Sequence, residues 1–275
     1  MNAIRFGSQF YTWQMSGQRY VGALPHITQI VRAAGFAGIE PETGMLGAYY
    51  DDPAALRDVL DQHGLALGAL TLVPDWIGPR ESEPEIRETE RVFSYLRNFP
   101  GAHLMLVQMP GTDRRDLRER QQNVIGCINA VAARAAGQGI ACSYHPNSPP
   151  GSLFRVMEDY QILLEGLDSR VVGFAPDTGH VAKGGIDVLE LFDTYGPLIR
   201  HVHFKDITAA GEWKAMGAGV IDFPRIVTRL RDTGYSGWIM IEDESVEAEM
   251  DPDAATQKNG EYLRQTLLPL VVAGV

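Results

Sequence analysis

Eight short apolar segments alternate with helix-like segments along the 275 residues of this chain, and this alternation restricts the possible folds more than any other feature. Strands that are separated by helices pair in parallel through right-handed crossovers. Eight such units close most simply into a barrel, for which about 250 residues are typical. We therefore expect an α/β fold, a single (β/α)8 TIM barrel over residues 1–275. The eight expected strands are residues 4–10, 36–40, 65–73, 102–109, 139–145, 171–177, 199–206 and 237–242.

The segments between the expected strands have helical periodicity. In residues 114–139, for example, Leu117, Val124, Ile128 and Val131 recur at helical spacing. The main alternative fold is an open, doubly wound sheet. We disfavour it because no glycine-rich turn follows the first strand, where a dinucleotide-binding fold would have one.

Composition and charge argue against several classes of partner. The formal net charge of −11 would repel the phosphate backbone of nucleic acids. The N-terminus lacks the apolar core of a signal peptide, and no apolar run reaches the roughly 18 residues of a membrane-spanning helix. The two cysteines, Cys127 and Cys142, are expected to be small core residues. We therefore expect a cytoplasmic protein that binds neither nucleic acid nor membranes.

Four consecutive expected strands end in residue types that bind metals. These residues are His145, Asp177, His203 and Glu242, at the ends of strands five to eight. Side chains at the C-terminal ends of successive strands build the active site of a β/α barrel. Two imidazoles and two carboxylates suit Mn²⁺, Fe²⁺, Co²⁺ or Zn²⁺ better than Ca²⁺. Asp177 alone could simply cap the next helix, but the joint occurrence favours a metal site.

Three more polar residues accompany these expected ligands. Because residues two apart share a face of a strand, Lys205, His203 and His201 point the same way. We expect His201 to be a hydrogen-bonded interior histidine. A divalent cation nearby should lower the pKa of Lys205 and suit it to proton transfer, and the alternative is a salt bridge to Asp206 or Glu242. His180, in the loop after the sixth strand, could bind substrate, orient a ligand or be a surface histidine.

Candidate substrate contacts lie on the same rim. Glu40 ends the second strand and Gln108 ends the fourth, both with inward parity, so either could hydrogen bond to sugar hydroxyls. For Glu40 the alternative is an ion pair under a loop. Trp13 and Trp213 are expected in rim loops, where aromatic faces stack on sugar rings or simply cover the barrel mouth.

Six motifs occur in order along the chain: GFAGIEPE, SYHPN, PDTGH, HVHFKD, GEWKAMGAGVIDFPRIV and GYSGWIMIEDE. With them the chain resembles the sugar phosphate isomerase/epimerase superfamily, the xylose isomerase-like barrels, over essentially its whole length. The resemblance implies one divalent metal ion, held at the four strand ends named above, and a substrate contact by Lys205. Mn²⁺ is the first expectation for this ion, with Co²⁺, Fe²⁺, Zn²⁺ or Mg²⁺ as alternatives.

The fifth-strand motif narrows the resemblance. Ketose epimerases of the superfamily have a glutamate there, whereas this chain has His145. Members resembling inosose dehydratase have a YHPH-type sequence, and SYHPN is close to it, with Asn147 replacing the second histidine as an expected substrate contact. Barrel subunits of C-glycoside deglycosidases look similar. The resemblance therefore implies removal of a proton beside a ketone and expulsion of a β-leaving group.

We expect a metal-dependent sugar lyase or isomerase that acts on a neutral keto-sugar, glycoside or inosose, since the scattered lysines and arginines form no phosphate cradle. Its expected catalytic residues are His145, Lys205 and Glu242, with His145 open as ligand or base. The alternatives are an aldose–ketose isomerase or epimerase on the same metal, and a non-catalytic sugar-binding barrel or one subunit of a heteromeric complex. By superfamily analogy we expect homo-oligomers or hetero-oligomers.

Overall fold

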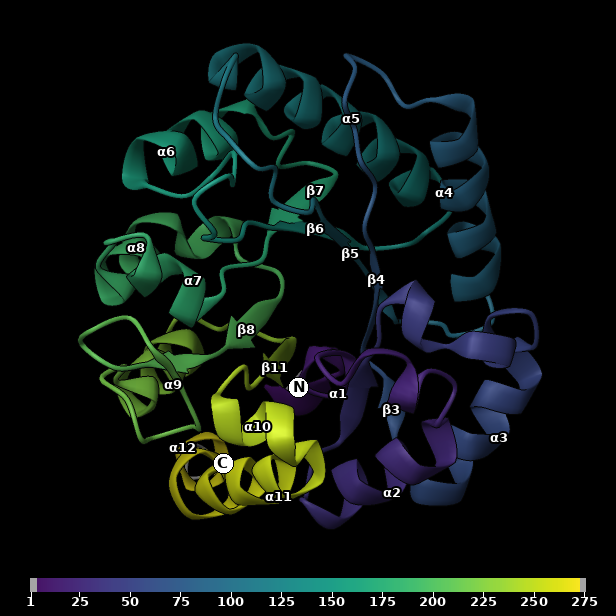
Figure 1. Ribbon diagram of the computed structural model, residues 1–275, viewed down its shortest axis with the longest axis vertical. Coiled ribbons are helices and arrows are strands. Elements are labelled where there is room, and N and C mark those ends of the chain that lie inside the picture. The colour runs from purple at the N-terminus through teal and green to yellow at the C-terminus, as the bar shows by residue number, and fades with distance from the viewer. Residues whose placement is uncertain (1–3, 273–275) are drawn as a thin grey trace.

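The computed structural model describes residues 4–272, and it forms a parallel β-barrel with a ring of helices around it (Figure 1). Each of the eight expected segments contains a barrel strand, and the third contains two. The barrel strands are β1 (Arg5–Gln9), β2 (Gly38–Glu40), β3 (Ala66–Leu67), β4 (Ala69–Leu72), β5 (His103–Val107), β6 (Cys142–His145), β7 (Val172–Phe174), β8 (Val202–Phe204) and β11 (Trp238–Ile241).

Hydrogen bonds join these strands into two arcs, β3-β2-β1-β11-β8 and β4-β5-β6-β7. Every pairing within the arcs is parallel. Isolated parallel bridges connect the arcs at both junctions, one between Glu42 and Thr71 and one between Asp177 and His203. The parallel ring confirms the predicted TIM barrel, and one of its closing bridges joins two of the expected metal ligands.

The third expected strand is interrupted at Gly68, where the chain passes from pairing with β2 to pairing with β5. Large side chains of β11 fill the barrel interior at this point. A Cβ atom on Gly68 would lie 2.3 Å from Met240 Cε and 2.9 Å from the Trp238 ring. Glycine therefore lets the backbone pass close to these side chains, as glycine within a strand often does.

A two-stranded hairpin follows β8 at the C-terminal end of the barrel. It pairs β9 (Asp206–Ile207) with β10 (Trp213–Lys214) in antiparallel register. The prediction of a simple rim loop around Trp213 is therefore wrong. The Asp206 carboxylate fixes the rest of this segment, because it accepts hydrogen bonds from the backbone N–H groups of Gly217 and Gly219, each at 2.9 Å.

Helices surround the barrel, and local sequence sets their ends. Asp222, for example, accepts a hydrogen bond from Arg225 N at 3.1 Å and so caps α9, as expected from an aspartate before the first turn. Gly64 follows α3 with a φ of +62°. The α-helices are α1 (Tyr11–Gln14), α2 (Leu24–Ala33), α3 (Pro53–His63), α4 (Glu83–Leu96), α5 (Leu117–Gly137), α6 (Met157–Gly166), α7 (Thr178–Lys183), α8 (Val188–Tyr195), α9 (Phe223–Asp232), α10 (Val246–Met250), α11 (Pro252–Tyr262) and α12 (Leu268–Val272).

Buried apolar side chains form one extensive core. Cys127 and Cys142 belong to it as free, buried thiols, as expected. Among residues 4–272, none of the helices is both long enough and apolar enough to cross a membrane.

Candidate active site

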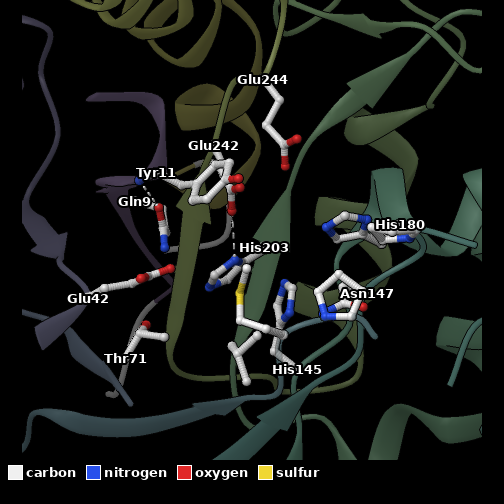
Figure 2. A pocket seen from close by; sticks show the side chains of 14 residues that line it. Gln9, Tyr11, Glu42, Thr71, His145, Asn147, His180, His203, Glu242 and Glu244 are labelled. Atoms are coloured by element: carbon white, nitrogen blue, oxygen red, sulfur yellow. Dashed lines mark hydrogen bonds and ion pairs between the residues drawn. The ribbon is translucent and has the colours of Figure 1, made fainter. Parts of the chain in front are cut away.

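The structure brings the four expected ligands together at the C-terminal end of the barrel. His145, Asp177, His203 and Glu242 are all buried, and one possible ligand atom from each lies within 4.8 Å of the others. The strand register explains part of this arrangement. His203 pairs with Asp177 on one side and with Met240 on the other, and Glu242 follows Met240 by two residues. Figure 2 shows His145, His203 and Glu242 around one pocket.

Hydrogen bonding leaves part of this cluster unsatisfied. Among residues 4–272, neither ring nitrogen of His145 has a hydrogen-bond partner, nor does Asp177 Oδ2, although all three atoms are buried. His145 Nε2 and Asp177 Oδ2 face each other at 3.6 Å. Buried polar atoms without partners are rare because they are unfavourable. Imidazole nitrogen and carboxylate oxygen are ligands of transition metals, so these residues fit the divalent ion that the sequence predicts.

Asp177 caps the next helix, which is one of the two functions that the sequence left open, and its second carboxylate oxygen faces the cluster. Its Oδ1 accepts a hydrogen bond from His180 N at 2.7 Å and so caps α7. Its Oδ2 has no hydrogen-bond partner among the described residues and lies 3.6 Å from His145 Nε2 and 3.5 Å from Lys205 Nζ. The cap fixes the orientation of the carboxylate, so it is positioned before any ligand arrives.

Lys205 lies among carboxylates and is not a residue of the pocket wall. Its side chain is 1 % exposed, and its Nζ lies 2.6 Å from Glu242 Oε1 and 3.5 Å from Asp177 Oδ2, and also contacts Glu244. Burial alone would lower the pKa of Lys205, but Asp177, Glu242 and Glu244 outweigh it and raise this pKa well above its ordinary value. The salt bridge to Glu242, one of the sequence-based alternatives, is therefore confirmed, and the lower pKa beside a cation and the contact with substrate stay predictions.

The Glu40 carboxylate lies inside the barrel within hydrogen-bond distance of two histidines. Its Oε2 lies 2.7 Å from His201 Nε2, its Oε1 lies 3.0 Å from His203 Nε2, and Thr71 Oγ1 donates to Oε1 at 2.9 Å. Because Glu40 is fully buried and does not line the pocket, the predicted contact with substrate hydroxyls is wrong. The ion-pair alternative is correct, and His201 is the interior histidine that the sequence predicted.

His203 belongs to both groups of residues. Its Nδ1 lies 3.2 Å from Glu242 Oε2, while its Nε2 contacts Glu40. Burial alone would lower the pKa of His203, but Glu40 and Glu242 raise it to about 10. Because a metal ligand must be neutral imidazole, an ion at this site would displace that proton.

Gln108 points away from the site, which corrects its predicted inward parity. On β5 the neighbouring Val107 pairs with His145 and lines the pocket. The Gln108 side chain instead donates to the backbone oxygen of Asp75 at 2.7 Å. Residues 102–109 are almost entirely apolar, and such a run does not reveal which face of a strand is inward.

The two tryptophans also differ from prediction. Trp13 lies in α1 and is fully buried, and its Nε1 donates to Asp253 Oδ1 at 2.8 Å, so it is not a rim residue. Trp213 does not line the pocket either. The centroid of its ring lies 5.3 Å from that of His180, in an edge-on arrangement, and 5.0 Å from Lys205 Nζ. Trp213 therefore packs against two residues of the site without lining the pocket.

His180 and Asn147 do line the pocket, as expected. His180 lies in the first turn of α7, where Ser148 Oγ and Lys205 Nζ contact its two ring nitrogens at 2.8 Å and 3.2 Å. Burial and the nearby Lys205 lower the pKa of His180 to about 3, so its ring is neutral. Asn147 donates to Gln108 O at 2.7 Å and accepts from Ser152, so its amide fixes the loop that it belongs to.

Several pocket residues were not singled out from the sequence. The pocket is a cavity of about 120 Å³ that is open to solvent. Gln9 ends β1 and Glu244 follows Glu242 by two residues, so strand parity could have identified both. The residues that complete the wall are Gln9, Tyr11, Glu42, Thr71, Val107, Met109, Pro110, Pro149 and Glu244 (Figure 2).

Comparison with known proteins identifies relatives of the whole barrel. An inosose dehydratase of Geobacillus thermodenitrificans is 27 % identical over 267 residues, which cover 85 % of this chain and 86 % of that protein. The crystal structure of the IOLI protein with a bound zinc atom has a TM-score of 0.76 at 16 % identity, covering 98 % and 99 % of the two chains. The 3-keto-D-glucoside 4-epimerase YcjR of E. coli has a TM-score of 0.74 at 18 % identity, covering 95 % and 99 %. At such identities the two structures support the fold alone. The sequence profile of the xylose isomerase-like TIM barrels matches residues 28–266, and this chain therefore belongs to that family.

Proposed function

We propose that this protein is a divalent-metal-dependent lyase that removes a proton beside the carbonyl of a neutral keto-sugar or inosose and then eliminates a β-hydroxyl or glycosidic group. The observation that supports this proposal best is the cluster of His145 and Asp177. Both ring nitrogens of His145 and the Oδ2 atom of Asp177 are buried without hydrogen-bond partners among the described residues, and His145 lines the pocket. The similarity to an inosose dehydratase over most of both chains favours elimination.

His145, Asp177, His203 and Glu242 would hold the metal ion, with Mn²⁺ proposed first. An ion bound there would supply a Lewis acid for the carbonyl oxygen of the substrate. The site has two carboxylates and two imidazoles, so it would be close to neutral with a divalent ion. A site of low negative charge leaves the ion more electrophilic than a site with three carboxylates would.

The protein residues around this cluster would bind and orient the sugar. Gln9 and Tyr11 contribute an amide and a hydroxyl group to the pocket wall, which suit a polyol. Lys205 would act through its neighbours, because its ammonium group holds the carboxylates of Glu242 and Glu244 in place. Val107, Met109 and Pro110 form an apolar part of the wall that would limit access of water.

The test is proton exchange in deuterated buffer, followed by NMR with scyllo-inosose and 3-keto-glucose as probes, on protein whose metal content has been measured. We expect about one ion per chain, exchange of the proton beside the carbonyl, and loss of both exchange and elimination when the ion is chelated. Exchange without elimination would instead support an epimerase or isomerase on the same site. Absence of both metal and exchange would contradict the proposal and favour a non-catalytic sugar-binding barrel or a subunit of a larger complex.

A further inference from the structure

Glu42 is a pocket carboxyl group that the proposed function has not yet used. It follows β2 by two residues and lines the pocket. Figure 2 shows its carboxylate on the side of the pocket opposite His145 and His180. Gln14 of α1 holds it there, since Gln14 Nε2 donates to Glu42 Oε2 at 2.8 Å. The group therefore has a fixed position and faces the space that a substrate would fill.

The charge environment of Glu42 differs from that of the other two glutamates in the wall. Glu242 and Glu244 both contact the Lys205 ammonium group. Glu42 has no ion pair within residues 4–272. Burial raises the pKa of Glu42, nearby Glu242 and Glu40 raise it further, and the hydrogen bond from Gln14 partly opposes them. A carboxyl group that a hydrogen bond holds in the pocket wall, without a cation beside it, can both accept and return a proton.

Gln14 can serve both protonation states of this carboxyl group. Its Nε2 donates to the carboxylate, while its Oε1 is buried without a hydrogen-bond partner among the described residues. Rotation of the amide would turn this acceptor toward a protonated Glu42. The amide group of Gln14 can therefore hydrogen bond to Glu42 in either protonation state of the carboxyl group.

The remaining titratable groups of the wall are less suited to accept the proton. Both ring nitrogens of His180 are engaged, by Ser148 and Lys205. Burial and nearby glutamates raise the pKa of the Tyr11 hydroxyl group, so it stays protonated. His145 belongs to the proposed metal ligands.

We propose that Glu42 is the general base of the reaction, an inference that rests on the proposed function. The Glu42 carboxylate takes the proton from the carbon beside the carbonyl, and the electron pair of that C–H bond forms the C=C bond of an enol(ate). The carbonyl then re-forms as the β-C–O bond breaks. The Glu42 carboxylic acid returns its proton to the leaving oxygen, which gives water or an alcohol and restores the carboxylate. One residue on one side of the substrate would thus perform a syn elimination.

The test compares the unaltered protein with Glu42→Gln and Glu42→Asp, using whichever probe, scyllo-inosose or 3-keto-glucose, the unaltered protein exchanges faster. We expect Glu42→Gln to keep about one metal ion per chain and its melting temperature, but to exchange the proton at least about 100-fold more slowly. Glu42→Asp should recover part of this loss. Exchange within 10-fold of the unaltered rate in Glu42→Gln would overturn the inference and leave the proposed function intact, whereas no exchange by the unaltered protein would overturn both.

A second variant provides a readout that a merely structural residue would not change. Gln14→Ala removes the hydrogen bond that lowers the pKa of Glu42. The acidic limb of the kcat/KM profile should therefore move to higher pH, by about 0.5 to 1 unit. Tyr11, Glu40 and Glu242 are the other titratable groups near Glu42, and none of them is altered in this variant. An unshifted limb would contradict Glu42 as the base.

Discussion

Two clusters that each combine histidines with a glutamate lie inside this barrel, one nearer its C-terminal end than the other, and they differ in how their polar atoms are hydrogen bonded. The upper cluster consists of His145, Asp177, His203 and Glu242 at the C-terminal end. The lower cluster consists of Glu40, Thr71, His103, Ser143 and His201. The upper cluster leaves two nitrogens of His145 and one oxygen of Asp177 without partners, whereas every side chain of the lower cluster has a hydrogen bond within the cluster or to His203.

This difference separates a ligand site from an internal support. Buried polar networks are stable when they are fully satisfied and unfavourable when they are not. Protein atoms already satisfy the hydrogen-bonding groups of the lower cluster. The upper cluster has nitrogen and oxygen atoms of metal-ligand type without hydrogen-bond partners among the described residues. His203 connects the two clusters, since Glu40 contacts one ring nitrogen and Glu242 the other.

The largest effect should come from removing the residue that the clusters share. His203→Ala deletes a proposed ligand and leaves Glu40 and Glu242 without one of their partners. We expect metal affinity to fall by more than about 100-fold, since loss of an outer-shell partner alone reduces it 10- to 100-fold. Isothermal titration with Mn²⁺ measures this directly, and turnover should disappear as well. If His203→Ala keeps full activity and its bound metal, the upper cluster is not the metal site.

Breaking the lower cluster should mainly reduce stability. Glu40→Ala removes the carboxylate that two buried histidines share, and deleting one partner of a buried charged pair typically costs about 3–5 kcal/mol. Urea unfolding at fixed metal concentration measures the change. Glu40→Gln keeps the size of the side chain and part of its hydrogen bonding, so its loss should be smaller. If Glu40→Ala unfolds at the same urea concentration as the unaltered protein, the lower cluster is not a structural support.

The lower cluster should also make stability depend on pH. Burial, with His201 and Arg200 nearby, lowers the pKa of His103 to about 3 despite the opposing effect of Glu40. An unfolded histidine binds a proton below about pH 6.5, whereas folded His103 stays neutral until about pH 3. The unfolded state therefore binds more protons in this window, and stability falls as the pH drops through it, by at most about 1.4 kcal/mol per pH unit.

The matched control for this pH effect is His103→Gln, which cannot titrate and can still reach Ser143. Unfolding free energies of both proteins at several pH values between 4 and 7 should give a shallower dependence for the variant. Other histidines contribute equally to both proteins, so the difference in slope belongs to His103. Parallel curves would show that His103 is not held neutral by its surroundings.

The smallest effect concerns a residue outside both clusters. Trp13→Phe removes the hydrogen bond from Trp13 Nε1 to Asp253 while keeping an aromatic ring in the core. We expect a loss of about 1 kcal/mol of stability and unchanged KM for the keto-sugar that the protein turns over. An increase in KM of more than about 10-fold would show that the sequence-based assignment of Trp13 to substrate binding was right after all.

A strand whose polar and apolar residues alternate reveals which of its faces is inward, and a strand that is apolar on both faces does not. For His203 and Lys205, polar side chains alternate with Val202 and Phe204, so the inward face is evident from the sequence. The apolar run around Gln108 is buried on both faces and gives no such signal, which explains the wrong parity. Glu40 and Glu42 share one parity, yet only Glu42 reaches the pocket, because histidines from β8 cover Glu40.

The sequence by itself determined the barrel, its eight strand positions and the meeting of four ligand-type residues at one end. It could do so because strand periodicity and strand order can be read from the sequence, and parallel pairing places the C-terminal ends of successive strands side by side. Only the tertiary structure decided which carboxylates are paired with cations, which are held by histidines and which stand free in the pocket. Those outcomes depend on side chains more than 30 residues apart in the chain, such as Glu40 with His203 at a separation of 163 residues. Burial and charge pairing therefore distinguish the functional residues from the structural ones among chemically identical side chains.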